Sequence, residues 1–127
     1  MWVTSKLWCT DHRRENVKPA CLKSLADLGL EYLDLYLIHF PIALKYVSPE
    51  KRYPASWFYD PEAKKPCMEE DKVPYHETWE AMEKLVEEGL VKNIGVSNLN
   101  TSMLRDVLNY AKVKPTVLQV EMHPYLT

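Results

Sequence analysis

Glycine and long apolar runs are scarce in this sequence, and each scarcity removes a class of protein. The 127 residues include only three glycines, Gly29, Gly89 and Gly95, and these stand apart from one another. Neither the G-x-G-x-x-G turn of classical dinucleotide-binding domains nor a phosphate-binding P-loop is therefore present. No run reaches the ~18 apolar residues that a membrane-spanning helix needs, so we expect no membrane span.

Cysteine and charge of one sign are also scarce. Three cysteines at wide, unequal spacing favour neither a disulfide framework nor a zinc site, and the four histidines lack metal-ligand spacing, so no metal is expected. Sixteen basic residues nearly balance 18 acidic ones, so no surface for nucleic acid or anionic lipid is expected. Residues 1–20 lack the apolar stretch of a signal peptide, which leaves a cytoplasmic protein with reduced thiols as the expectation.

What the sequence does have is apolar periodicity, with hydrophobic residues making up 46% of the chain. Strands are predicted at residues 2–8, 33–38, 90–97 and 116–121. Helices are predicted within residues 15–30, where Gly29 is the expected cap, and at residues 76–88 and 100–111. Gly29 and Gly89 are expected to end helices, Asn100 or Thr101 to cap the third one, and Pro19 to lie in the first turn of its helix. Alternating strands and helices predict βαβ units and a parallel sheet.

Two architectures share this pattern, and the pattern alone does not separate them. An open four-stranded sheet would leave two unprotected edges. A closed (β/α)8 barrel needs about 250 residues, so this chain would supply only part of one. Residues 41–75 interrupt the pattern with six of the nine prolines and with Tyr46, Tyr53, Trp57, Phe58 and Tyr59. These aromatic residues either line a ligand site or only fix the loop to the core.

Polar side chains stand at or near the carboxyl end of every predicted strand. They are Lys6, His39, Ser97 with Asn98, and Gln119 with Glu121. Each alone has an ordinary structural explanation, such as a lysine reaching solvent, a core histidine or a turn pair. Because the carboxyl ends of parallel strands meet at one edge, the set predicts a site with an ammonium group, an imidazole, a hydroxyl and two carboxamides. Such a site suits proton transfer to a carbonyl oxygen and the binding of a neutral amide.

With these residues in this order, the whole chain resembles the aldo-keto reductases. The resemblance lies in "VTSKLW" at 3–8, "LDLYLIHFP" at 33–41, "EEGLVKNIGVSN" at 87–98 and "LQVEMHPYL" at 118–126. It implies that residues 1–127 are a partial (β/α)8 TIM barrel containing its third to sixth strands. It also implies that NADPH, or NADH, binds at the C-terminal mouth and that aldehydes and ketones are reduced to alcohols. Within the family, "HFPIALKYV" and the proline-rich segment resemble fungal xylose reductases, which implies aldose sugars such as xylose as substrates.

The resemblance also implies roles for the residues near the reacting carbonyl. Lys6 corresponds to the lysine that lowers the pKa of a catalytic tyrosine, and His39 to the histidine that orients the substrate carbonyl. Trp8 and Phe40 correspond to walls of the substrate pocket. The tyrosine and an aspartate partner belong to barrel segments that come before residue 1, so we expect the parent enzyme to be active and the isolated chain to be inactive.

The same resemblance implies that the nicotinamide carboxamide is bound by Ser97, Asn98 and Gln119. Leu99 departs from the family signature, which has an aromatic residue after "GVSN", and this departure is expected to alter the packing beneath the cofactor. One alternative is a non-catalytic NADPH-binding or regulatory protein on the same scaffold. Another is a half barrel that closes by dimerising, so the oligomeric state is left open.

Overall fold

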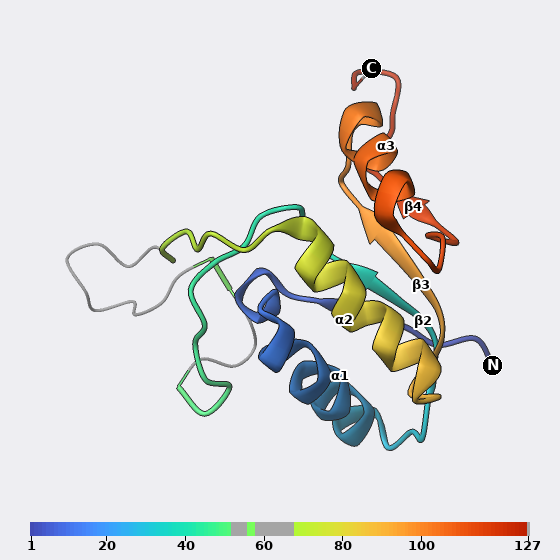
Figure 1. The fold of residues 1–127 in the computed structure, drawn as a ribbon. Coiled ribbons are helices and arrows are strands. Elements are labelled where there is room, and N and C mark those ends of the chain that lie inside the picture. Colours follow the sequence, from blue (N-terminus) through green and yellow to red (C-terminus); the bar gives the residue numbers. More distant parts are fainter. Residues whose placement is uncertain (52–55, 58–67, 127) are drawn as a thin grey trace.

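A computed structural model describes residues 1–51, 56–57 and 68–126 of the chain. Within these residues, four parallel strands form one sheet in the order β1-β2-β3-β4, with helices between the strands (Figure 1). The elements are β1 (Thr4–Leu7), the 3-10 turn η1 (Cys9–Asp11), α1 (Arg14–Leu28), β2 (Leu33–Ile38), α2 (Tyr75–Glu87), β3 (Val91–Ser97), α3 (Thr101–Tyr110) and β4 (Leu118–Gln119). The predicted order of strands and helices is confirmed.

The last strand is shorter than the sequence predicts. Residues 116–121 were expected to be extended, but β4 holds only Leu118 and Gln119, which pair with Val96 and Ser97 of β3. Within the described residues β4 has a partner on one side only, so no second ladder of hydrogen bonds lengthens it. Apolar alternation alone does not reveal whether a neighbouring strand is available.

The expectation that Pro19 lies in the first turn of its helix is wrong, because α1 already begins at Arg14. Pro19 has no N–H to donate to the carbonyl of Glu15, but both residues are exposed, so water can bind that carbonyl. The predicted helix end is confirmed: Gly29 has φ +66° and donates its N–H to the Ala26 carbonyl at 3.2 Å. Asn100, not Thr101, caps α3, since its side chain accepts from the Met103 N–H.

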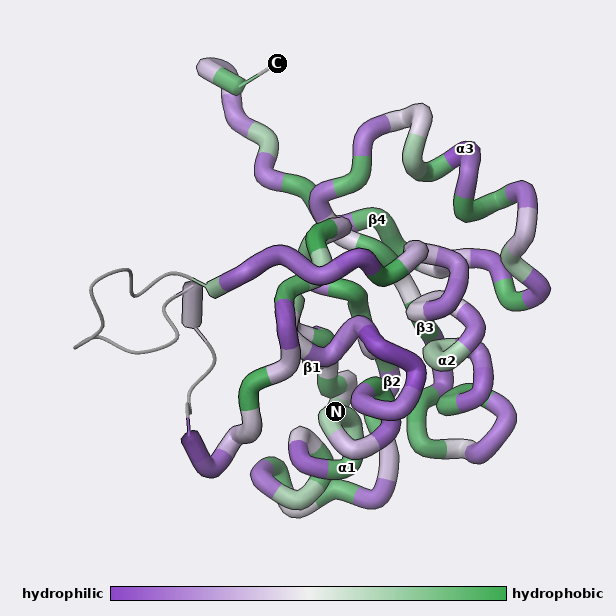
Figure 2. The backbone as a smooth tube through the Cα atoms, turned by 60° about the vertical axis from the view of Figure 1, so that its left-hand side comes forward, coloured by the Kyte–Doolittle hydropathy of each residue, from purple (hydrophilic) through white to green (hydrophobic). Residues whose placement is uncertain are grey.

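One face of the sheet is covered by the helices (Figure 1), and the core lies between them. The buried residues of α1 are Val17, Cys21 and Leu25, spaced as one helical face. Hydrophobic and hydrophilic residues alternate along the helices (Figure 2), as helices with one buried face require. Leu28 and Leu108 share the apolar spacing of their helices but are exposed near the ends of α1 and α3. In the described part of the chain no helix is both long and apolar enough to cross a membrane.

The opposite face of the sheet carries a hollow of about 680 Å³, lined by Thr4, Lys6, Leu35, Leu37, Val117, Leu118, Gln119, Val120 and Met122. Its residues come from β1, β2 and β4 with the residues that flank β4. Gly95 of β3 allows the close approach of the strands here: a Cβ atom would lie 2.6 Å from a Leu37 methyl carbon and 2.6 Å from the Val117 carbonyl oxygen. This second face is the one that bears the predicted site.

Candidate functional site

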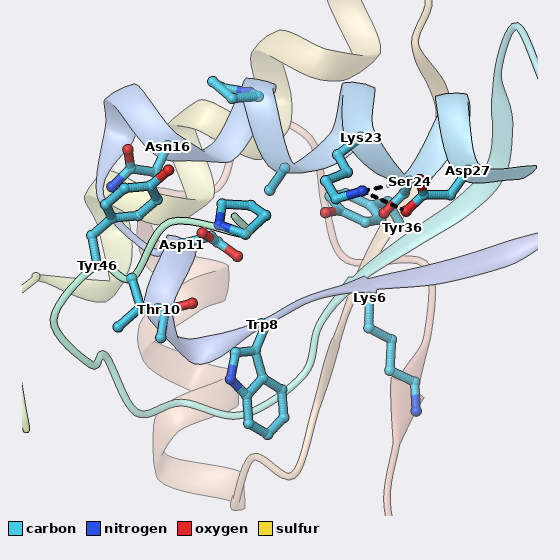
Figure 3. A pocket seen from close by; sticks show the side chains of 14 residues that line it. Lys6, Trp8, Thr10, Asp11, Asn16, Lys23, Ser24, Asp27, Tyr36 and Tyr46 are labelled. Atoms are coloured by element: carbon cyan, nitrogen blue, oxygen red, sulfur yellow. Dashed lines mark hydrogen bonds and ion pairs between the residues drawn. The ribbon is translucent and has the colours of Figure 1, made fainter. Parts of the chain in front are cut away.

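Lys6 and Gln119 line the same hollow, from the first and the last strand of the sheet. Residues alternate between the two faces of a strand, so Lys6 projects opposite to Ser5 and Leu7, which face the helix layer. Figure 3 shows Lys6 and Trp8 extending on the other side of β1 from Ser24 and Tyr36. The sheet thus places an ammonium group and a carboxamide on the face that the described helices leave uncovered.

His39 follows directly after β2 and is half-buried. Its ring is stacked on Phe40, with centroids 4.7 Å apart and planes at 10°, and meets the edge of Trp8 at 5.2 Å. Burial lowers the pKa of His39 below its usual 6.5, and the charge of Lys6 lowers it further. The imidazole is therefore neutral at pH 7 and carries one N–H that can donate to a ligand oxygen.

An aromatic wall surrounds this histidine. Trp8 and Phe40, which the resemblance assigns to the pocket walls, contact each other edge to face. Trp57 adds a third ring at 4.9 Å from Trp8 and 5.3 Å from Phe40. Trp57 was singled out in the sequence only as one of several loop aromatics. Three of those residues, Tyr53, Phe58 and Tyr59, lie outside the described part of the chain, and exposed Tyr46 belongs to a different hollow.

The loop that carries Trp57 is held at its base by two segments, residues 43–45 and 69–71. Leu44 pairs with Glu70 in an antiparallel bridge, and the Leu44 N–H donates to the Cys9 carbonyl of η1 at 2.9 Å. The guanidinium of Arg13 donates two hydrogen bonds, of 2.7 and 2.6 Å, to the Asp71 carboxylate. These contacts hold residues 44 and 70–71 against η1 and the start of α1.

Ser97 ends β3, Asn98 follows it, and both side chains bind backbone carbonyls at the end of β2. The Ser97 hydroxyl lies 2.7 Å from the Ile38 carbonyl and 2.9 Å from the His39 carbonyl, and the Asn98 side-chain amide donates to the His39 carbonyl at 2.8 Å. Ser97 is buried, whereas Asn98 is exposed. With its nitrogen engaged, the Asn98 side-chain oxygen is left to accept a hydrogen bond from a ligand.

Gln119 joins the same edge through its backbone, since its carbonyl accepts from the Asn98 N–H at 2.9 Å. The predicted residues Lys6, His39, Ser97, Asn98 and Gln119 therefore all lie at the carboxyl edge of one sheet. Glu121, which the sequence grouped with Gln119, is not part of this edge: it lies beyond the end of β4, where its carboxylate is 3.2 Å from the His123 ring.

The described residues give little support to metal binding or to a thiol nucleophile. No three side chains of the metal-ligating types come together among them. The Cys9 and Cys21 thiols are free and buried, and burial raises their pKa values to about 12 and about 11, which keeps them protonated at pH 7 and poor nucleophiles. Cys67 lies outside the described residues.

A second hollow, of about 320 Å³, is lined mainly by residues of η1 and α1 and is also bordered by Lys6 and Trp8 (Figure 3). Asp11 lines it, and burial raises the pKa of this carboxyl to about 6. The next residue, His12, is almost fully buried, and burial lowers its pKa to about 4. Neither residue was predicted to be buried, because "CTDHRREN" has no apolar period that would mark it as part of the core.

A parallel sheet with a helix layer on one face and polar side chains at its carboxyl edge is the arrangement found in part of a (β/α)8 barrel enzyme. The model of the aldo/keto reductase family matches residues 1–127. The chain belongs to this family.

Individual relatives agree with that assignment. The chain is 52% identical over 126 residues to the NAD(P)H-dependent D-xylose reductase of Pyricularia oryzae, covering 99% of this chain and 38% of that protein. It is 52% identical over 131 residues to the corresponding enzyme of Pachysolen tannophilus, covering 99% and 39%. The solved aldose reductase of Giardia lamblia matches with a TM-score of 0.83 and 47% identity, covering 98% of this chain and 38% of that one. The chain thus spans well under half the length of these relatives.

Proposed function

We propose that residues 1–127 form the central part of an NAD(P)H-dependent reductase that converts aldehydes or ketones, with aldose sugars such as D-xylose as candidate substrates, to alcohols. The observation that carries this proposal is the placement of Lys6, His39 and the Ser97–Asn98 pair at one sheet edge, with His39 kept neutral. The names of the xylose reductases above support the substrate class and the cofactor. The free thiols of Cys9 and Cys21 agree with a cytoplasmic location.

The side chains at this edge fit a nicotinamide carboxamide. Such a group offers one acceptor oxygen and two N–H donors, so it pairs best with side chains that offer both functions. Asn98 has its oxygen available as an acceptor, Ser97 has hydroxyl lone pairs, and the Gln119 carboxamide is exposed at the end of β4. When bound, the dinucleotide supplies the hydride.

Two side chains act on the carbonyl oxygen in this proposal. The neutral imidazole of His39 donates its N–H to that oxygen and so fixes the direction of the carbonyl group. The ammonium of Lys6, whose charge lowers the pKa of His39, favours any anion that forms beside it. The rings of Trp8, Phe40 and Trp57 exclude water from one side of the substrate.

The test is NADPH oxidation with D-xylose and with a simple aldehyde, using the complete polypeptide that carries residues 1–127. Lys6→Met and His39→Gln should each lower kcat/KM by on the order of 10²- to 10⁴-fold, the usual contribution of a proton-transfer group. Lys92→Met is the matched control, because Lys92 lies in β3 at the far end of the sheet, over the Tyr32 ring. Equal activity of Lys6→Met and Lys92→Met would contradict the proposed role of Lys6.

The isolated 127-residue chain should show no turnover above its own Lys6→Met variant. The reason is the resemblance, which assigns the proton-donating tyrosine to a segment before residue 1. Measurable carbonyl reduction by the purified chain would overturn this expectation. A complete polypeptide that binds NADPH, but reduces no carbonyl compound, would favour the non-catalytic alternative.

A further inference from the structure

A line of hydrogen bonds crosses the carboxyl ends of all four strands. The His39 N–H donates to the Leu7 carbonyl of β1 at 3.0 Å. The His39 carbonyl accepts from the Asn98 side chain at 2.8 Å, and the Asn98 backbone N–H donates to the Gln119 carbonyl of β4 at 2.9 Å. His39 lies one residue beyond β2, where its N–H makes the last bond of the β1–β2 ladder.

The backbone of Asn98 is shaped for this contact. Its φ of +60° makes it the one residue other than glycine with a left-handed backbone in the described part of the chain. Asparagine adopts this conformation more readily than most residues, because its short polar side chain can bond locally. Asn98 is exposed, so water can bind its side-chain amide in place of the His39 carbonyl. The bond to that carbonyl is therefore not a consequence of burial.

Ser97, which is buried, also binds the His39 carbonyl. The Ser97 hydroxyl lies within hydrogen-bond distance of both the Ile38 carbonyl and the His39 carbonyl. Because it has one proton, it either alternates between the two carbonyls or donates one bifurcated bond to both. Ser97, the last residue of β3, and Asn98, which follows it, thus bind the last carbonyl of β2 and the first one after it.

We propose that Ser97 and Asn98 are positioning residues for the imidazole of His39, acting through the His39 backbone carbonyl, in addition to any contact with the cofactor. The orientation of the ring depends on the direction of the backbone that carries it. Holding the N–H to β1 and the carbonyl to β3 fixes that direction and keeps the ring between Trp8 and Phe40. This inference rests on the proposed function for its catalytic meaning, but the positional effect exists without cofactor or substrate.

The first experiment measures the position of the ring directly, by proton NMR of the complete polypeptide without cofactor. The His39 ring protons lie close to the Phe40 and Trp8 rings, whose ring currents displace their resonances. Asn98→Gly removes the side-chain bond and keeps the left-handed backbone without strain. It should move the His39 resonances toward those of an exposed histidine, and Ser97→Ala should move them in the same direction.

Two further variants make the result specific. Asn93→Ala removes a bond of the same kind between the same two strands, from the Asn93 side chain to the Asp34 carbonyl at 2.9 Å, at the opposite end of the sheet. It should leave the His39 resonances in place, as should Ser97→Thr, which retains the hydroxyl. Unchanged His39 resonances in Asn98→Gly, or an equal change in Asn93→Ala, would overturn the proposal.

The second experiment measures turnover at saturating NADPH, so that a weakened cofactor contact is compensated. Asn98→Gly should lower kcat by on the order of ten- to a hundredfold, because small misplacement of a catalytic group has effects of this size. Asn93→Ala should retain the wild-type kcat. If the wild-type polypeptide reduces no carbonyl compound, the proposed function fails, while the NMR comparison still decides whether Ser97 and Asn98 position His39.

Discussion

At the scale of single residues, Asp11 and His12 give the protein two opposed pH dependences. Burial raises the pKa of Asp11 from 3.8 to about 6, so between these values the unfolded chain loses a proton that the folded chain keeps, and stability declines as pH rises. Burial lowers the pKa of His12 from 6.5 to about 4, so stability declines as pH falls through this range. The two effects partly cancel between about pH 4 and 6.

Asp11→Asn should therefore raise the free energy of unfolding at pH 7 by on the order of 1–2 kcal/mol, because no charge is then buried. At pH 4 the gain should shrink, since the folded protein already holds Asp11 protonated. Urea unfolding at both pH values measures the difference, with Asp106→Asn on the exposed face of α3 as the control. An equal gain at pH 4 and pH 7 would show that buried charge is not the cause.

At the scale of elements, two side chains of α2 bind the backbone N–H and the backbone carbonyl of Val113, which lies in the turn between α3 and β4. The Glu83 carboxylate accepts from the Val113 N–H at 2.5 Å, and the Trp79 indole donates to the Val113 carbonyl at 3.1 Å. Glu83 and Trp79 are one helical turn apart and both buried. The turn that feeds β4 into the sheet is thus fixed by α2.

Glu83→Ala should destabilise the protein by about 1–3 kcal/mol, since it leaves the Val113 N–H without its acceptor. Glu83→Gln should cost much less, because the amide oxygen can accept the same bond. Thermal and urea unfolding of both variants provide the measurement. Equal losses for Ala and Gln would mean that the bond to Val113 does not carry the stability of this turn.

Gly95 controls the spacing of β3 and β4. Gly95→Ala should destabilise by about 1–3 kcal/mol, the usual cost of overpacking, because the new methyl group would meet the Val117 carbonyl and a Leu37 methyl group. Adding Leu37→Ala should restore only part of the loss, since the backbone carbonyl of Val117 cannot be trimmed. Urea unfolding of the single and double variants tests this, and full restoration would contradict it.

Elements with a strong local signal were predictable, and those that depend on neighbours were not. The bounds of β2 were predicted correctly because its apolar run is broken only by Asp34, and α1 was predicted to end at Gly29 because glycine adopts the left-handed conformation of a helix cap. The length of β4 depends on pairing with other strands, and sequence alternation does not report pairing. The start of α1 was predicted within one residue of Arg14, but the placing of Pro19 in the first turn was wrong, because its missing N–H is tolerated further along, at the exposed face.

At the scale of the whole molecule, the two faces of the sheet differ sharply. One is buried under helices, while the region of β4 exposes Val117, Leu118 and Val120, with 38, 39 and 47% of their surface accessible. Apolar side chains beside an unpaired strand edge favour association with another chain. We therefore expect the 127-residue chain by itself to self-associate as its concentration rises.

Val120→Lys should reduce this association, because it places a charge beside the edge of β4. Leu28→Lys is the matched control, since Leu28 is 51% exposed but lies at the end of α1, away from the sheet. Light scattering over a range of concentrations measures the effect. A monomer at every concentration, or the same change in both variants, would show that β4 is not the associating edge.

The candidate site was predictable as a set of side chains but not as a set of contacts. Because parallel strands end at the same edge, Lys6, His39, Ser97, Asn98 and Gln119 could be grouped from their positions alone. The hydrogen bonds that join them are made largely by backbone groups, which are the same at almost every position and so leave no signal in the sequence. Trp57 reaches the site through long-range contacts of its loop, such as the bond between Leu44 and Cys9, and no local pattern in the sequence predicts these contacts.

The line of hydrogen bonds across the strand ends has an evolutionary consequence. At Leu7 and Gln119 the line uses only carbonyl oxygens, so the side chains there can be exchanged without removing a bond. Position 98 is different, because the line passes through its side chain. The side chains at positions 7 and 119 can therefore change, and ligand preference with them, while the hydrogen bonds between the strand ends are kept. A substitution of Asn98 removes one of these bonds.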